Sequence, residues 1–250
     1  MKNVRAKKHL GQHFLNDNEI AFNITNLLSH TTKHVIEIGP GMGALTQFLV
    51  TEKFKTEVVE IDTESILYLQ LNYPNLIIHK GDFLQLNLED LFPKRISLIG
   101  NFPYNISSQI LFKTFKHKDQ IVQLVGMFQK EVAERIACKK GKKRGILSVL
   151  LQAFYDVEYC FTVDQYVFNP PPKIKSGVVR LIRNNRIALS CNEQKFMKIV
   201  KSGFNQKRKT LRNALKPFTL ENISELKDLL TLRAEQLSVD DFIKITNHVR

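Results

Sequence analysis

The sequence predicts an α/β protein with a mostly parallel sheet, followed by a small helical domain. From about residue 17 to residue 130, short apolar runs alternate with helix-like segments, which is typical of parallel strands joined by helices. After about residue 183 the apolar residues recur with helical spacing only. We therefore expect one domain over residues 1–183 and a second, helical domain over residues 184–250.

The individual elements follow from where the apolar runs begin and end. Asp17 can cap a helix over 20–28. Strands are expected at the continuous apolar runs 34–38, 58–61, 76–79, 96–99, 121–128, 157–161 and 178–182. Helices are expected at 45–49, 66–69, 131–137, 196–204, 223–230 and 242–249. Three consecutive prolines predict a stiff, extended loop over 167–172.

The chain carries a large positive charge. Its 250 residues include 37 Lys and Arg against 24 Asp and Glu, which gives a net charge of +13. The cations form three clusters, which are Lys2, Arg5, Lys7 and Lys8; Lys139, Lys140, Lys142, Lys143 and Arg144; and Lys201, Lys207, Arg208, Lys209, Arg212 and Lys216. Such an excess attracts polyanions, and no helix has the long apolar face of a membrane-surface helix. We expect a nucleic-acid partner and no membrane.

The cysteines and apolar runs bear on the compartment. No N-terminal apolar segment resembles a signal peptide, and no apolar run approaches the ~18 residues of a membrane span. Cys138, Cys160 and Cys191 lie far apart and lack metal-ligand spacing. We expect a cytoplasmic protein without a bound metal.

A glycine-rich turn follows the first predicted strand. Gly39, Gly41 and Gly43 alternate with other residues, and glycine lets the backbone turn tightly and approach a small ligand. The spacing differs from the dinucleotide fingerprint, and Pro40 removes a backbone donor that a pyrophosphate would use. The turn alone is also compatible with an ordinary strand-to-helix connection.

Acceptor side chains follow the next predicted strands. Glu60 ends the second strand, where a carboxylate can accept both ribose hydroxyls, and Asp82 follows the third, where it can accept an adenine amine. Asn101 follows the fourth strand. Each alone is compatible with a helix cap or a solvated residue, but the carboxyl ends of parallel strands meet at one edge. The set fits an adenosine ligand without a pyrophosphate better than NAD, and S-adenosylmethionine is the candidate.

The segment from Asn101 to Tyr104 is suited to holding a nucleic-acid base. The Asn101 oxygen can accept a hydrogen bond from an exocyclic amine, and Pro103 fixes the backbone beside it. The Tyr104 ring offers a face on which a flipped base can stack. Taken alone, the segment is equally typical of a common turn.

Four ordered motifs resemble those of the ribosomal RNA adenine N6,N6-dimethyltransferases. They are residues 6–17, the turn 37–43, the segment 101–104, and the loop 167–172 with Lys173 and Ser176. The resemblance covers nearly the whole chain and is greatest to the branch that dimethylates two adjacent adenosines near the 3′ end of 16S rRNA. It implies a Rossmann-like, S-adenosylmethionine-dependent methyltransferase domain and a helical domain that contacts RNA. It also implies a monomer that acts on an immature small ribosomal subunit.

The resemblance implies roles for single residues as well. The implied cofactor-binding residues are His13, Leu15, Gly39, Glu60, Asp82 and Asn101. The implied catalytic residues are Asn101, Phe102, Tyr104 and Phe168. Tyr104 and Phe168 would sandwich the flipped adenine. The family more usually has asparagine in place of His13 and leucine or isoleucine in place of Phe102, and we expect activity to survive both departures.

Three other functions stay open on the sequence alone. A 23S rRNA dimethyltransferase that confers antibiotic resistance shares many of these motifs. A DNA adenine methyltransferase usually carries proline in place of Phe102 and a separate target-reading domain, for which this chain has little room. A non-catalytic RNA-binding assembly factor could keep the fold, although the intact acidic residues and Asn101 argue against it.

Overall fold

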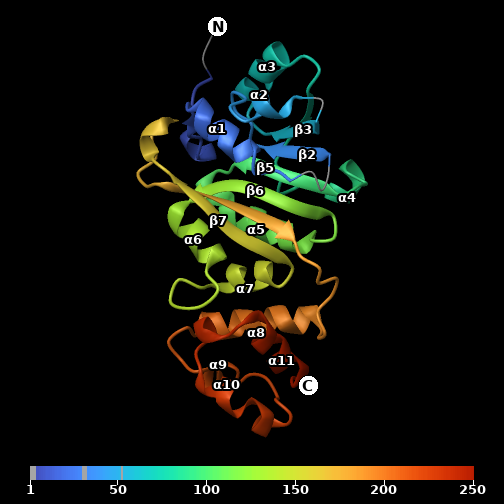
Figure 1. Ribbon diagram of the computed structural model, residues 1–250, viewed down its shortest axis with the longest axis vertical. Coiled ribbons are helices and arrows are strands. Elements are labelled where there is room, and N and C mark those ends of the chain that lie inside the picture. The colour runs from blue at the N-terminus through green and yellow to red at the C-terminus, as the bar shows by residue number, and fades with distance from the viewer. Residues whose placement is uncertain (1–3, 30–32, 52) are drawn as a thin grey trace. The chain divides into compact units, whose positions relative to one another are not determined.

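The computed structural model of the chain describes residues 4–29, 33–51 and 53–250, so Lys2 of the first basic cluster lies outside the described residues. The chain divides into two compact units (Figure 1). The first comprises Met1–Ala133 and Val157–Arg183, and the second comprises Glu134–Asp156 and Asn184–Arg250. The longer segment of the second unit thus begins at the expected boundary, while residues 134–156, expected in the first domain, belong to the second unit.

The first unit is built on a sheet that has seven strands within the described part of the chain, in the order β4-β3-β2-β5-β6-β9-β7. The strands are β2 (His34–Ile38), β3 (Lys55–Glu60), β4 (Ile77–Lys80), β5 (Ile96–Asn101), β6 (Ile121–Gln129), β7 (Tyr155–Val163) and β9 (Ser176–Arg183). Strands β4 to β6 of this order are parallel, and β9 runs antiparallel to β6. The chain moves outward from β2 to β4 and then returns to β5 beside β2. Ligands bind open α/β sheets at such a switch point, outside the carboxyl ends of the strands.

Burial explains why these strands could be predicted. Every residue of β2 after His34 is buried, and so is every residue of β5 before Asn101. Strands covered on both faces read as continuous apolar runs. Because the two strands are parallel neighbours, their carboxyl ends lie side by side at one edge of the sheet.

Helices connect these strands and cover the sheet (Figure 1). They are α1 (Asn18–Thr25), α2 (Thr46–Leu49), α3 (Thr63–Asn72), α4 (Leu88–Leu91), α5 (Ser107–Lys116) and α6 (Lys130–Ala137), with the 3-10 helices η1 (Lys8–Leu10), η2 (Tyr104–Ile106) and η3 (Gln165–Val167). The Asp17 side chain accepts a hydrogen bond from the Ile20 backbone N–H at 3.0 Å, which confirms the predicted cap of α1.

A second, two-stranded sheet joins distant parts of the first unit. Strand β1 (Phe14–Leu15) pairs antiparallel with β8 (Phe168–Asn169), and Leu15 lies opposite Phe168. The loop expected at 167–172 is therefore extended, with its first part paired and its prolines beyond the strand. This pairing places the Phe168 ring in the apolar core beside Leu15 and Val178.

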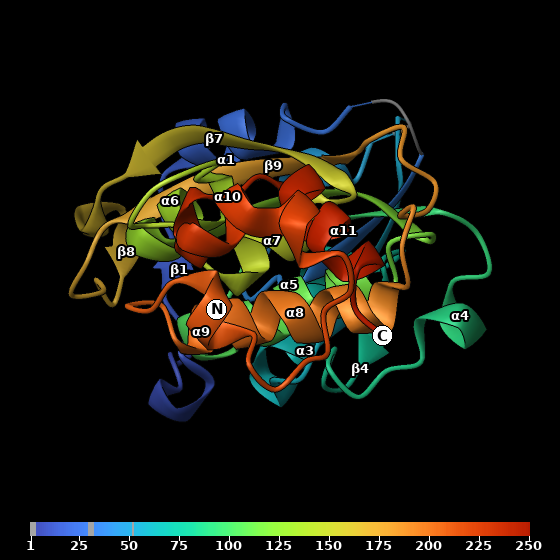
Figure 2. The same ribbon diagram turned by 90° about the horizontal axis from the view of Figure 1, so that it is seen from below.

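The second unit is helical apart from its share of β7. Its described helices include α7 (Ile146–Gln152), α8 (Glu193–Asn205), α9 (Leu211–Ala214), α10 (Lys227–Thr231) and α11 (Val239–Asn247), with η4 (Ile223–Leu226) and η5 (Ala234–Gln236) (Figure 2). The buried face of α8 includes Phe196, Ile199 and Val200, and its Phe204 ring stacks on Phe242 of α11 at 6.1 Å. Over the described residues of both units, no helix is long and apolar enough to cross a membrane.

Candidate functional site

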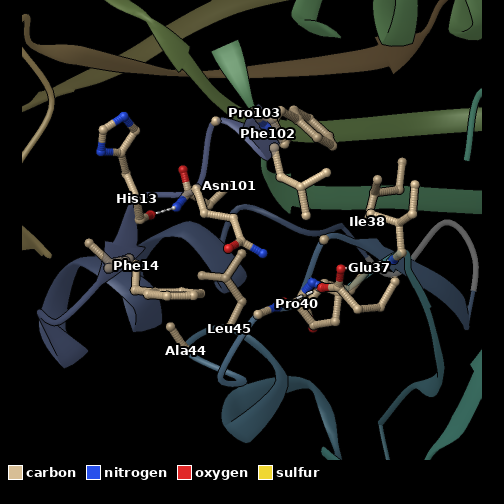
Figure 3. Close-up of a pocket in the computed structure, with 18 of the residues that line it drawn as sticks. His13, Phe14, Glu37, Ile38, Pro40, Ala44, Leu45, Asn101, Phe102 and Pro103 are labelled. Carbon is tan, nitrogen blue, oxygen red and sulfur yellow. Dashed lines mark hydrogen bonds between the residues drawn. The ribbon is translucent and has the colours of Figure 1, made fainter. Parts of the chain in front are cut away.

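A cavity of about 470 Å³ lies at the carboxyl ends of β2, β3 and β5 in the first unit (Figure 3). Its walls come from the segment around His13, the glycine turn, the ends of the following strands and the Asn101–Tyr104 segment. In Figure 3, His13 and Phe14 lie on one side of Asn101, and Glu37 and Pro40 lie on the other. The structure thus brings three of the four sequence motifs to one cavity.

The glycine turn borders open space. Gly39, Gly41 and Gly43 have φ angles of 66°, 55° and 81°, in the left-handed region that favours glycine. A Cβ atom at Gly39 would meet no heavy atom within 4 Å, so the backbone there can approach a ligand directly. At Gly41 a Cβ would lie 2.8 Å from the Phe14 ring, which shows that the N-terminal segment packs against the turn.

Glu60, at the end of β3, is held by backbone donors. One carboxylate oxygen accepts the Gly41 N–H at 3.1 Å, and the other accepts the N–H groups of Ile61 and Asp62 at 2.8 and 2.9 Å. Burial raises the pKa of Glu60, and these three hydrogen bonds oppose the rise. A carboxylate has about four acceptor sites. A ribose bound here would therefore share Glu60 with the turn that surrounds it.

Asp82 lies in the loop that follows β4. The Gly81 N–H donates to the Glu60 carbonyl at 2.8 Å, which ties this loop to the end of β3. The Asp82 Oδ1 accepts the Leu84 N–H at 2.9 Å. The side chain is thereby oriented at the cavity wall, where its carboxylate has further acceptor capacity for a ligand.

Asn101, the last residue of β5, has a fixed amide. Its Nδ2 donates to the backbone carbonyl of His13 at 2.8 Å (Figure 3). Only the NH₂ end of an amide can donate to a carbonyl, so this bond decides which end of the group is the oxygen. Asn101 therefore presents its Oδ1 as an acceptor, and it links the end of β5 to the N-terminal segment.

Phe102 is anchored at both its backbone and its ring. Its N–H donates to the Met127 carbonyl at 3.2 Å, and its ring is 1% exposed and 5.0 Å from the Phe128 ring. The ring lies over Gly100 and Gly126, which face each other across β5 and β6. These two glycines leave room for a phenyl ring at a position where the resembled family usually has an aliphatic residue.

Tyr104 forms a polar contact with the first residue of β9. Its hydroxyl lies 2.6 Å from the Ser176 Oγ, and its ring centroid is 5.7 Å from that of His13. Burial raises the pKa of the Tyr104 hydroxyl. The His13 ring is itself placed by a 2.7 Å contact between its Nδ1 and the Pro170 carbonyl. The Tyr104 ring is thus held at the cavity wall from two directions.

Phe168 occupies a different position from the other expected site residues. Phe168 is 4% exposed and packs in the apolar core. Among the described residues, it is not one of those that line the cavity. Leu15, its partner across the two-stranded sheet, both borders the cavity and packs in that core. The stacking role of Phe168 stays a prediction.

Glu37 is a cavity residue to which sequence reasoning gave no role of its own. It lies in β2, where its Oε2 accepts the Thr46 hydroxyl at 2.6 Å. Burial raises the pKa of Glu37 to about 8, so the carboxyl is protonated at neutral pH. The signal in the sequence that could have pointed to Glu37 is a glutamate inside an otherwise apolar predicted strand.

A second missed feature fastens the N-terminal segment. Asp62, the N-cap of α3, accepts hydrogen bonds from Lys7 Nζ and, at 3.1 Å, from Gln12 Nε2. The Lys7 N–H in turn donates to Gln12 Oε1 at 2.7 Å. Lys7 and Gln12 lie in the motif over residues 6–17, but Asp62 is about 50 residues further along the chain, so only the fold reveals their contact.

The described residues contain no cluster of His, Cys, Asp and Glu side chains that could hold a metal ion.

Comparison with known proteins gives the family. The model described as "Ribosomal RNA adenine dimethylase" matches residues 3–250. The chain belongs to this family. Membership confirms the predicted Rossmann-like methyltransferase fold, the enzyme class and S-adenosylmethionine as the cofactor. The roles expected for single residues stay predictions.

Several relatives match over almost their full length. The chain is 58% identical to the "Ribosomal RNA small subunit methyltransferase A" of Cytophaga hutchinsonii, over 99% of this chain and 98% of that protein. It is 53% identical to the protein of the same name from Flavobacterium johnsoniae, over 100% and 97%.

Solved structures agree with this placement. A dimethyladenosine transferase from Plasmodium falciparum superposes with a TM-score of 0.80 and 28% identity, over 93% of this chain and 96% of that one. The 23S rRNA methyltransferase ErmE gives a TM-score of 0.71 with 21% identity, over 94% and 99%. The second likeness shows the shared fold alone.

Proposed function

We propose that this protein transfers methyl groups from S-adenosylmethionine to N6 of two adjacent adenosines near the 3′ end of 16S rRNA, giving N6,N6-dimethyladenosines. The observation that carries the proposal is the single cavity at which an open glycine turn, Glu60, Asp82 and Asn101 converge. Relatives at 51% to 58% identity that are named for the small ribosomal subunit support 16S rRNA as the substrate over 23S rRNA.

Each predicted cofactor-binding residue would contact a different part of S-adenosylmethionine. Gly39, with open space beyond its backbone, would approach the methionine moiety. Glu60 would hold the ribose and Asp82 the adenine, in keeping with their places at the end of β3 and just after β4. His13 and Leu15 would cover the ligand from the N-terminal segment. When bound, S-adenosylmethionine supplies an electrophilic methyl group, so the protein needs mainly to align the acceptor.

The target amine needs help because its lone pair is delocalised into the adenine ring. The Asn101 Oδ1 and the Phe102 carbonyl would accept the two N6 hydrogens, which concentrates the lone pair on nitrogen and stabilises developing positive charge. The hydrogen bond from Asn101 Nδ2 to His13 supports this role, because it leaves the oxygen as the acceptor end. No strongly basic side chain is required for such a step.

Stacking would hold the flipped base. Tyr104 is fixed at the cavity wall by Ser176, and Phe168 would provide the second aromatic face. Stacking on an aromatic side chain contributes ~1–3 kcal/mol per base, which would help offset removal of the adenine from the RNA. Because Phe168 lies in the core, its stacking requires the ring to turn toward the base.

The basic clusters would contact the phosphates of the RNA. The protein would act in the cytoplasm as a monomer, on an immature small ribosomal subunit. Lys139, Lys140, Lys142 and Lys143 are exposed and accessible to a phosphate backbone. Arg144, expected in the same role, is only 2% exposed. Exposed cations near the C-terminus, such as Arg208 and Lys209, would add further contacts.

The test is methyl transfer by the purified protein. Small ribosomal subunits and 23S rRNA, both from cells lacking this gene, would be incubated with labelled S-adenosylmethionine. The proposal predicts two dimethyladenosines in 16S rRNA and none in 23S rRNA. Label in 23S rRNA alone would favour the resistance-type enzyme, and binding of 16S rRNA without transfer would favour an assembly factor.

A further inference from the structure

Lys113 holds the loop that carries Asp82. It lies on α5, the helix that follows the Asn101–Tyr104 segment, and its Nζ donates to the backbone carbonyls of Phe83, Leu84 and Leu86 at 2.7, 3.1 and 2.5 Å. An ammonium group has three donor hydrogens. All three are used on one loop.

This loop needs an external donor because it has no regular structure. Residues 81–87 form neither helix nor strand, and Gly81 has a φ angle of 145°. Within the loop, the Asp82 carboxylate accepts the Leu84 N–H and the Asp82 carbonyl accepts the Gln85 N–H, both at 2.9 Å. Lys113 thus binds the carbonyl of Leu84, whose N–H donates to the Asp82 carboxylate, and the carbonyls of Phe83 and Leu86 in the same loop.

The Lys113 ammonium group also interacts with side chains of this loop. Its Nζ lies 4.9 Å from the centroid of the buried Phe83 ring. Burial lowers the pKa of Lys113, and the negative charge of Asp82 opposes that change, so the two groups interact electrostatically. Lys116, three residues further along α5, is exposed. The two lysines are therefore a matched pair on one helix, of which one holds the loop.

We propose that Lys113 is a positioning residue that fixes Asp82 for recognition of the cofactor's adenine. The inference rests on the proposed contact between Asp82 and the adenine amine. Because α5 begins just after the segment proposed to hold the target adenine, one helix connects the two adenine sites. Loss of the Lys113 ammonium is expected to weaken cofactor recognition and to leave RNA affinity unchanged.

The experiment compares two ligands that differ only at the purine 6-position. Titration calorimetry would measure S-adenosylhomocysteine, which has the amine, and its 6-deamino analogue, which has a hydrogen atom there. We expect Lys113→Met to bind the adenosyl ligand about tenfold more weakly and the deamino ligand nearly as wild type, because only the former has an amine for Asp82 to accept. Lys116→Met should behave as wild type toward both ligands.

Further variants separate positioning from a general structural effect. If Lys113 acts through Asp82, Lys113→Met should cause no further loss of discrimination in an Asp82→Asn background. Lys113→Gln retains donors for the loop and should give a smaller loss, and it serves as the test if the Met variant does not fold. Wild-type discrimination in either folded Lys113 variant would overturn the inference. Failure of the wild-type protein to bind S-adenosylhomocysteine would instead overturn the proposed function.

Discussion

At the scale of single residues, the site depends on side chains whose polar ends are already engaged. Asn101 uses its nitrogen on His13, and Glu60 uses both oxygens on the backbone around it. Such prior engagement orients the remaining acceptor sites before a ligand arrives, which lowers the cost of ordering them on binding. Sequence reasoning predicted roles for these residues from their places at and after strand ends, but it could not reveal their partners.

The buried carboxyl of Glu37 predicts a pH dependence of stability. Its folded pKa of about 8 lies above the ordinary value of 4.5, so the folded state keeps the proton while the unfolded state releases it. The free energy of unfolding should therefore fall by about 1.4 kcal/mol per pH unit between these values from this group. Glu37→Gln, which keeps an acceptor for Thr46, should remove that slope. Urea unfolding of the cofactor-free protein at pH 5 to 8 tests this, and parallel curves for the two proteins would contradict it.

The Phe102 ring predicts coupling with Gly126. A Cβ at Gly126 would lie 2.3 Å from the Phe102 ring and 2.7 Å from the Phe128 ring, so Gly126→Ala should destabilise by about 1–3 kcal/mol through overpacking. Phe102→Leu should recover part of that loss. Gly100→Ala is the comparison: its Cβ would meet the Phe102 ring at 2.8 Å but also the Ile38 carbonyl oxygen at 2.7 Å, and a smaller residue 102 cannot relieve that backbone clash, so Phe102→Leu should recover less of its loss. Strictly additive losses for Gly126→Ala and Phe102→Leu in denaturant unfolding would refute the coupling.

At the scale of elements, the buried parallel strands were predictable and the pairings between distant segments were not. The strand expected at 34–38 is found with the same bounds, because a strand buried on both faces leaves a continuous apolar run. Helix α5 was missed although Ile110, Leu111 and Phe115 repeat at helical spacing, since it begins with two serines directly after an irregular turn. Strands β1 and β8 have two residues each, and their pairing depends on long-range contacts that no local pattern records.

The N-terminal segment predicts a kinetic effect on the cofactor. Asp62→Asn keeps an N-cap for α3 but removes the charge that Lys7 contacts. The segment carrying His13 should then leave the cavity more readily, and S-adenosylhomocysteine should dissociate about three- to tenfold faster in stopped-flow measurements. Glu64→Gln is the matched control, because Glu64 is an exposed partner of Lys7 at 3.3 Å and should matter little. Equal dissociation rates for Asp62→Asn and wild type would exclude this role.

At the scale of the whole molecule, composition indicated the kind of partner, and packing decided which segments form each unit. The charge of +13 favours nucleic acid. Residues 134–156 join residues 184–250 through contacts such as the Gly141 N–H to the Glu235 carbonyl at 2.9 Å and Lys207 Nζ to the Arg144 carbonyl at 3.1 Å. The helical periodicity after residue 183 gave no sign that an earlier segment belongs there.

The most direct test of the central claim is mass spectrometry of 16S rRNA from cells in which this gene is deleted and then restored. The wild-type gene should restore both adjacent dimethyladenosines, and an Asn101→Ala gene expressed at the same level should restore neither while its protein still binds the RNA. Persistence of both dimethyladenosines in the deleted cells, or their full restoration by Asn101→Ala, would contradict the account.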